Sequence, residues 1–295
     1  MNEETARCFD EIVFTATDGL SLYARDYQAI SAGEAGKAAV ICLAGLSRNS
    51  RDFHHFAIAV RERTGRRVVA IDYRGRGRSA WDDNKANYNI ATECGDVLSA
   101  LSALSVDRAV FVGTSRGGLI LHVLASSRPD LMAGAILNDI GPVIEPAGLR
   151  EIARYLNRGE RPRDWTQAEG ILRTTHGANF PVLSDEDWRD MAEAVYVEKD
   201  GGIHADFDPA IAQHLLTLDF ESPLPNLWAQ FEAFGKMPLM AISGEHSTLL
   251  SAQTLAEMSR RHPGLRRHLA TGQGHAPLLH RRDVFSAVVD FIQSI

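Results

Sequence analysis

Short apolar runs alternate with segments of helical periodicity along most of this chain. The apolar runs are rich in β-branched residues and predict strands over residues 12–15, 20–27, 38–43, 67–71, 109–112, 133–137, 237–243 and 265–269. Helical spacing predicts helices over residues 52–63, 90–104, 119–125, 251–260 and 282–292. Short apolar strands that alternate with helices predict an α/β fold, with a mostly parallel sheet and helices on both faces.

The pattern changes after Pro142. Residues 143–235 contain Trp165, Trp188 and Trp228, several prolines and amphipathic helical pieces, but no clear buried strand. We therefore expect a core in two parts, residues 1–142 and 236–295, interrupted by a helical cap insertion over residues 143–235.

Composition narrows the function classes. The 295 residues are 45% hydrophobic, enough for one large α/β domain with an insertion, and the net charge of −7 argues against nucleic-acid and anionic-membrane partners. The chain has three widely spaced cysteines, which are typical of a reducing compartment and suggest neither a disulfide framework nor a zinc site. We expect no metal and no cofactor. The acidic N-terminus lacks an apolar signal region, and no run reaches membrane-spanning length, so a cytoplasmic protein is expected.

The segment 113–117 reads Gly-Thr-Ser-Arg-Gly and lies between an expected strand and an expected helix. This G-x-S-x-G pattern is typical of a nucleophile elbow. We expect glycine at 113 and 117 because a Cβ would collide with the neighbouring strand or helix in so tight a turn. The turn would lift the Ser115 hydroxyl out of the sheet edge. The plainer alternative is a strand–helix turn with a solvated serine.

With three further segments, the chain resembles the α/β-hydrolase superfamily over nearly its full length. These segments are residues 43–46, residues 72–79 (Asp-Tyr-Arg-Gly-Arg-Gly-Arg-Ser) and residues 272–277 (Gly-Gln-Gly-His-Ala-Pro). The resemblance implies a hydrolase fold with a helical cap over the active site. Esterases, lactonases, C–C bond hydrolases and some non-hydrolytic enzymes share this fold, so the fold does not choose the substrate.

A serine hydroxyl needs a base within hydrogen-bond reach. His275 follows the last expected strand, where the resemblance places the family's histidine, and we prefer it to the other histidines considered, which are His54, His55, His122, His176, His204 and His214. The oxyanion of an acyl-transfer reaction needs preorganised donors. The expected donors are the Arg116 N–H at a helix N-terminus and the Leu46 N–H, although residues 44–45 read Ala-Gly where many relatives have His-Gly.

The third member of a triad is less clear. The resemblance places it after the strand that follows the cap, where Thr248 occupies the expected aspartate position. Threonine carries no negative charge to stabilise an imidazolium. Asp139, at the end of an expected strand, and Glu245 are the two substitutes, and we favour Asp139. A site without an acid is the third possibility.

Two charged positions have competing interpretations. The Arg116 side chain either binds an acidic group of the substrate or forms a salt bridge within the protein. Asp72 and the arginines in residues 74–78 are expected to fix their loop. The loop is too arginine-rich for a dinucleotide fingerprint.

These residues predict a serine hydrolase that cleaves a small carboxylic ester, with an apolar or aromatic group, through an acyl-serine intermediate. A place in the core is the preferred interpretation for each aromatic residue of this region, and the ones also considered for the pocket walls are Trp165, Phe180, Trp188, Phe207, Trp228 and Phe231. The alternatives are a lactonase or C–C bond hydrolase using the same Ser115 and His275, and a non-catalytic ligand-binding protein, which Thr248 would favour. A small-molecule substrate is the expected partner.

Overall fold

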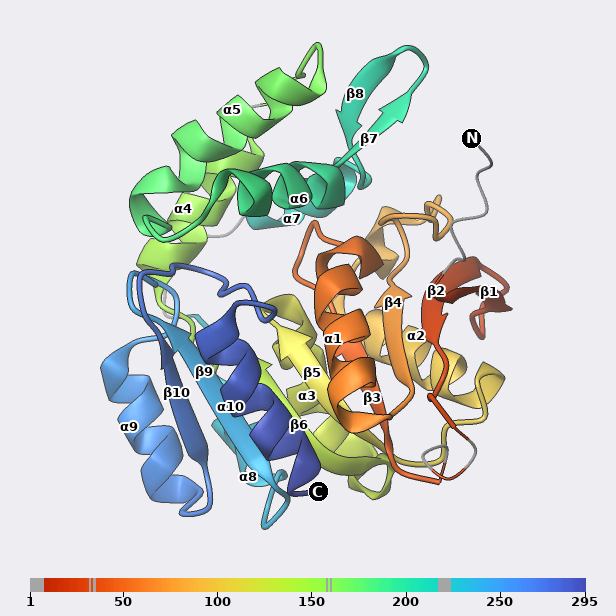
Figure 1. The fold of residues 1–295 in the computed structure, drawn as a ribbon, viewed down its shortest axis with the longest axis vertical. Coiled ribbons are helices and arrows are strands. Elements are labelled where there is room, and N and C mark those ends of the chain that lie inside the picture. The colour runs from red at the N-terminus through yellow and green to blue at the C-terminus, as the bar shows by residue number, and fades with distance from the viewer. Residues whose placement is uncertain (1–7, 32, 34–35, 158, 160, 217–223) are drawn as a thin grey trace.

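An eight-stranded sheet runs through the core of the computed structural model, which describes all residues except 1–7, 32, 34–35, 158, 160 and 217–223 (Figure 1). The strand order is β1-β2-β4-β3-β5-β6-β9-β10, and the six strands from β4 to β10 in this order run parallel. The strands β1 and β2 form an antiparallel hairpin, and β2 pairs antiparallel with β4 at the edge of the parallel strands. The strands are β1 (Asp10–Thr15), β2 (Ser21–Tyr27), β3 (Ala39–Leu43), β4 (Val68–Asp72), β5 (Ala109–Thr114), β6 (Met132–Asn138), β9 (Leu239–Gly244) and β10 (Arg266–Ala270).

Helices cover both faces of the sheet. Apolar side chains of α1 (His54–Thr64) and α10 (Arg282–Gln293) form one buried cluster with one face. The opposite face packs against α2 (Ile90–Ala103), α3 (Arg116–Ser127), α8 (Trp228–Glu232) and α9 (Ala252–Arg261). The predicted α/β-hydrolase fold class, with a mostly parallel sheet covered on both sides, is confirmed.

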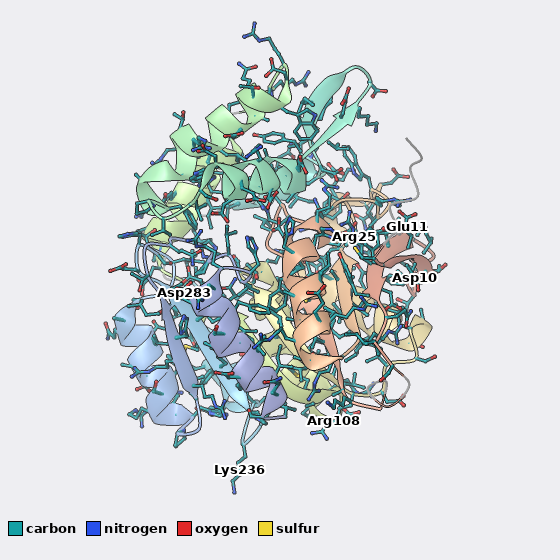
Figure 2. All side chains as sticks on the ribbon, viewed as in Figure 1. Asp10, Glu11, Arg25, Arg108, Lys236 and Asp283 are labelled. Carbon is teal, nitrogen blue, oxygen red and sulfur yellow. The ribbon has the colours of Figure 1, made fainter. Side chains whose placement is uncertain are left out.

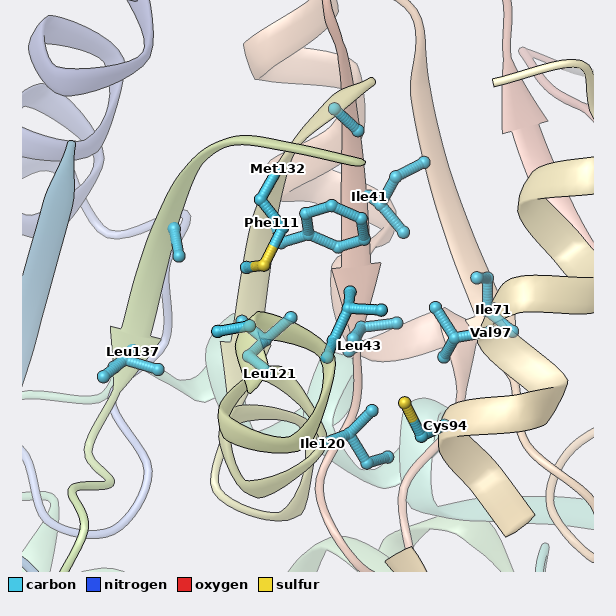
Figure 3. Close-up of a cluster of buried hydrophobic side chains, with 14 of the residues drawn as sticks. Ile41, Leu43, Ile71, Cys94, Val97, Phe111, Ile120, Leu121, Met132 and Leu137 are labelled. Atoms are coloured by element: carbon cyan, nitrogen blue, oxygen red, sulfur yellow. The ribbon is translucent and has the colours of Figure 1, made fainter. Parts of the chain in front are cut away.

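The central strands are buried because both of their faces are covered. All residues of β3, β4 and β6 are buried. Ile41, Leu43 and Phe111 on the sheet belong to the same cluster as Ile120 and Leu121 of α3 (Figure 3). This packing fixes the ends of β5 and β6, and with them the start of α3.

A second group of elements lies over one end of the sheet (Figure 1). We call α4 (Pro146–Leu156), α5 (Trp165–His176), α6 (Asp185–Val195), α7 (Ala210–Leu216), β7 (Tyr196–Lys199) and β8 (Gly202–Ala205) the cap elements. Of these elements, α5, α6 and the β7–β8 hairpin share a separate apolar cluster that includes Leu172, Phe180 and Trp188. Ile152 of α4 and Leu215 of α7 belong instead to the cluster that packs on the sheet. The helix α8, which also falls within 143–235, packs against α3, and its Phe231 belongs to the sheet cluster as well. The division at 142 and 235 therefore stays a prediction.

The hairpin of β7 and β8 lies where the sequence predicts no buried strand. Most of its residues are exposed or half-buried, and Tyr196 and Ile203 alone are buried, so the apolar signal of a core strand is missing. The turn between the strands is Asp200-Gly201, and both residues have positive φ, 54° and 75°. Asp-Gly is the preferred sequence for such a hairpin turn, so a local signal was present.

The surface away from the cap elements is charged. Arg108 and Lys236 project from the end of the molecule opposite the cap elements (Figure 2). None of the helices in the described part of the chain has the length and hydropathy needed to cross a membrane.

Candidate active site

Ser115 occupies a sharp turn between β5 and α3. Its φ is 50° and its ψ is −112°, a conformation that is costly for a residue with a side chain. A Cβ on Gly113 would lie 2.6 Å from a backbone nitrogen of α3, and one on Gly117 would lie 2.2 Å from the Leu43 carbonyl oxygen. The Ser115 N–H donates to the Asn138 carbonyl oxygen at the end of β6, at 3.0 Å. The two glycines let the strand and the helix approach closely enough to hold this turn.

The structure brings Ser115, His275 and Asp139 into one chain of hydrogen bonds. Ser115 Oγ lies 2.9 Å from His275 Nε2, and His275 Nδ1 lies 2.8 Å from Asp139 Oδ2. The Asp139 side chain is fully buried, and its Oδ1 accepts from the Gly244 N–H at 2.9 Å. The Asp139 N–H donates to the Ile242 carbonyl oxygen at 2.8 Å. These contacts fix the carboxylate against the imidazole.

The other two positions considered for the acid point elsewhere. Glu245 Oε2 accepts from the Gly272 N–H at 2.7 Å, which ties together two loops beside the site. Thr248 is exposed, and its hydroxyl lies 3.2 Å from Glu151 Oε2. Of the two substitutes left open by the sequence, Asp139 and Glu245, the geometry therefore favours Asp139.

The two predicted oxyanion donors flank the serine. Arg116 is the first residue of α3, where a helix leaves its N–H groups without intrahelical acceptors. Leu46 lines the cavity in front of Ser115, and a Cβ on Gly45 would lie 3.9 Å from Ser115 Cβ. Within the described part of the chain, neither the Leu46 N–H nor the Arg116 N–H donates to a backbone acceptor.

The Arg116 side chain forms an ion pair within the protein. Its Nε lies 2.5 Å from Glu93 Oε2, and its Nη2 donates to the Tyr88 carbonyl oxygen at 3.3 Å. Arg116 is not among the residues that line the cavity. Of its two interpretations, the internal salt bridge is the one that the structure contains.

Asp72 fixes the arginine-rich loop, as predicted. Its carboxylate accepts from the Ser50 N–H at 2.6 Å and from the Arg78 N–H at 2.9 Å. Burial raises the pKa of the Asp72 carboxyl, and these two amide donors oppose that rise. Arg74 is buried and its ion pairs, with Asp18, Asp82 and Asp96, hold the rest of the loop.

A cavity of about 1160 Å³ opens between the strand ends and the cap elements, and Ser115 and His275 line it. Phe180 and Phe207, two of the aromatic residues considered for the wall, are part of it. The other four aromatic residues considered for the wall, Trp165, Trp188, Trp228 and Phe231, do not line it. Trp188 is buried inside the cap cluster, while Phe231 packs in the core beneath the sheet. Trp165 is exposed at the start of α5, and Trp228 lies against Arg261.

Sequence analysis missed a set of polar residues in this wall. Arg48, two residues beyond Leu46, forms a two-point ion pair with Asp52, and both residues line the cavity. Tyr155 lines it from the cap, and burial raises the pKa of its phenol to about 12, so the phenol is neutral near pH 7. Opposite charges four residues apart, as in Arg48 and Asp52, are a sequence signal that could have been used. Among the described residues, no cluster of histidine, cysteine and carboxylate side chains could hold a metal ion.

Comparison with known proteins agrees with the fold. A family model described as alpha/beta hydrolase fold matches residues 38–168. The 3-hydroxybutyrate-oligomer hydrolase of Cupriavidus necator is 31% identical over 252 residues, which cover 81% of this chain and 82% of that protein. The chain belongs to the α/β-hydrolase family.

Two further relatives extend the comparison. The crystal structure of an alpha/beta hydrolase from Novosphingobium aromaticivorans is 32% identical, covers 98% of this chain and 99% of its own, and superposes with a TM-score of 0.87. The 2-(acetamidomethylene)succinate hydrolase of Mesorhizobium japonicum is 26% identical over 78% of this chain and 79% of its own length. The relatives thus include hydrolases named for different substrates.

Proposed function

We propose that this protein is a serine hydrolase that cleaves a small carboxylic ester through an acyl-serine intermediate. The observation that carries the proposal is the chain of contacts from Ser115 Oγ through His275 to Asp139, at 2.9 Å and 2.8 Å. A buried carboxylate at Nδ1 keeps the proton on that nitrogen, which leaves Nε2 free to accept the serine proton.

In the proposed reaction, Ser115 Oγ attacks the ester carbonyl carbon while His275 Nε2 takes the hydroxyl proton. The Leu46 and Arg116 N–H groups stabilise the developing oxyanion. His275 then gives its proton to the leaving alcohol, which leaves the acyl group on Ser115. A water molecule, deprotonated by the same imidazole, hydrolyses the acyl-serine and restores the free hydroxyl.

The substrate class rests on the cavity and on the relative from Cupriavidus necator. Oligomers of a hydroxy acid are joined by ester bonds, and a cavity of about 1160 Å³ has room for a substrate of more than one unit. We therefore propose short oligomers of a hydroxy acid as the first esters to test, together with p-nitrophenyl acetate and butyrate.

The test compares the wild-type protein with Ser115→Ala. We expect the wild type to hydrolyse at least one of these esters and Ser115→Ala to lose the activity, by about 10⁴-fold or more. Equal turnover by the two proteins would remove Ser115 from the mechanism.

Lactone opening or C–C bond hydrolysis is the second candidate reaction. The substrate named for the relative from Mesorhizobium japonicum is not an ester, which is a reason to test reactions other than ester hydrolysis. The same Ser115 and His275 would serve. Turnover of lactones or of ring-fission products, with esters left intact, would favour this candidate. A ligand-binding protein without activity would leave Ser115 unlabelled by a fluorophosphonate.

A further inference from the structure

We infer that Glu93 is a positioning residue that holds both halves of the oxyanion hole in place through Arg76 and Arg116. This inference rests on the proposed serine mechanism and deepens it, because it names a buried residue outside the cavity on which transition-state stabilisation depends.

Glu93 lies in the first turn of α2, and its side chain is fully buried. Both of its carboxylate oxygens are used. Oε1 accepts from Arg76 Nη1 at 2.7 Å, and Oε2 accepts from Arg116 Nε at 2.5 Å. A buried carboxylate is strongly unfavourable unless it is paired, so these two bonds hold Glu93 and both arginines in one arrangement.

Each arginine reaches one half of the oxyanion hole. Arg76 Nε donates to the Leu46 carbonyl oxygen at 2.8 Å and so fixes the residue whose N–H is one expected donor. Arg116 carries the other expected donor on its own backbone. A single carboxylate therefore connects two segments that are 70 residues apart in the chain, at positions 46 and 116.

Glu93, Arg76 and Arg116 do not line the cavity, so they act through the backbone that they hold. The side chain of Arg76 is fully buried and that of Arg116 is 14% exposed. Two guanidinium groups share one carboxylate, and burial, together with the charge of Arg116, lowers the pKa of Arg76. Loss of the Glu93 charge would leave two like charges facing each other beside the oxyanion hole.

The test uses Glu93→Gln with Asp96→Asn as its matched control. Both residues lie on α2, both are buried, and both pair with an arginine, so each change removes one buried negative charge from the same helix. Arg74, the partner of Asp96, keeps its ion pairs with Asp18 and Asp82 in the control. Thermal melting first sets a temperature at which both variants are folded.

Three measurements follow at that temperature. They are kcat and KM with p-nitrophenyl butyrate, the rate of inactivation by a fluorophosphonate, and the affinity for an alkyl boronic acid, which forms a tetrahedral adduct. We expect Glu93→Gln to lower kcat and the inactivation rate by about tenfold or more, with KM within about twofold. Boronate affinity should fall by a similar factor, while Asp96→Asn stays within about threefold of wild type in each measurement.

The inference is overturned if Glu93→Gln matches Asp96→Asn in kcat and boronate affinity, or if it changes KM alone. Should Glu93→Gln not fold, Arg116→Lys replaces it, because that side chain is partly exposed and the backbone donor remains. We expect the same fall in kcat without a change in KM, and unchanged kinetics would overturn the inference. A wild-type protein that reacts with the fluorophosphonate but hydrolyses no ester would instead count against the proposed substrate class.

Discussion

Asp139 combines a fully buried carboxylate with a φ of 54°. Aspartate tolerates this left-handed conformation better than most residues, and here it turns the side chain back toward the sheet edge. One oxygen faces His275 and the other accepts from the Gly244 N–H, so the carboxylate has little freedom to rotate. Such a fixed carboxylate both selects the imidazole tautomer and stabilises the imidazolium.

Asp139→Asn should lower kcat by about 10⁴-fold while leaving the fold intact. The amide is nearly the same size, but it carries no charge and can hold the imidazole in the wrong tautomer. Ester hydrolysis and a thermal melt of the variant provide the measurement. A loss of less than about tenfold would show that Asp139 is not the acid.

Thr248→Asp is the companion variant. Thr248 lies on the surface, with its hydroxyl against Glu151, so a carboxylate there is expected to leave kcat within about twofold. In the Asp139→Asn background it should give no rescue. A large gain in either background would reassign the acid to the loop after β9.

Some of these residues were predictable and others were not. Ser115 and His275 follow from local motifs, because a tight turn and its glycines leave a signature in sequence. Asp139 stayed one of three options, since sequence gives no side-chain directions at a loop where several strand ends meet. Glu93 left no signal, because its burial depends on two arginines from distant segments.

At the scale of elements, α3 links the site to the core. His122 lies on this helix, fully buried, with its ring against those of Phe231 and Phe234. Its Nδ1 lies 2.7 Å from the Gly118 carbonyl oxygen. Burial lowers the pKa of His122 to about 4, although the contact with Gly118 opposes the shift. The histidine is therefore neutral in the folded protein at pH values where the unfolded chain binds a proton.

The stability of the protein should depend on this histidine below about pH 6.5. Because the folded pKa lies below the unfolded value, stability is present at neutral pH and is lost as the pH falls toward 4. Between pH 7 and pH 5, the proton uptake of His122 in the unfolded chain lowers the free energy of unfolding by about 2 kcal/mol. Urea unfolding of wild type and His122→Leu at both pH values measures it.

The difference in the free energy of unfolding between pH 7 and pH 5 should be smaller in His122→Leu than in the wild type by that amount. His246→Gln, at an exposed histidine, is the control and should retain the wild-type pH dependence. An unchanged pH dependence in His122→Leu would contradict the assignment of the low pKa to this residue.

Element boundaries were largely predictable because the strands are buried on both faces. The predicted strand over residues 109–112 and the observed β5 begin at the same residue, and the predicted helix over 282–292 nearly coincides with α10. The strands of the β7–β8 hairpin were not predicted, because they bury little apolar surface. The Asp-Gly turn was the one sequence signal of this hairpin.

At the scale of the molecule, Arg51 is the main polar link between the loop after β3 and the cap elements. Its guanidinium donates to the carbonyl oxygens of Glu193, Ala194 and Tyr196, and it pairs with Asp206 at 2.6 Å. One side chain thus fixes the end of α6 and the strands that follow it. Charged hydrogen bonds of this kind contribute about 1.5–3 kcal/mol each when well formed.

Arg51→Met should therefore loosen the cap elements without unfolding the sheet. We expect amide hydrogen exchange in α6 to accelerate by about tenfold or more, while exchange in β5 and β6 is unchanged. Arg128→Met, which removes an exposed ion pair with Asp130, is the control. Equal exchange rates in α6 for the two variants would contradict the role given to Arg51.

The order of the site residues along the chain has an evolutionary consequence. Ser115 and Asp139, the proposed nucleophile and acid, both precede residues 143–235, on adjacent strand ends joined by the bond from the Ser115 N–H to Asn138. His275, the proposed base, alone follows. Replacing the cap elements with a segment of another length would leave the spacing between Ser115 and Asp139 unaltered. New specificities can therefore arise by exchange of the cap elements, with α8 kept in the core, while the residues proposed for the chemistry are inherited intact.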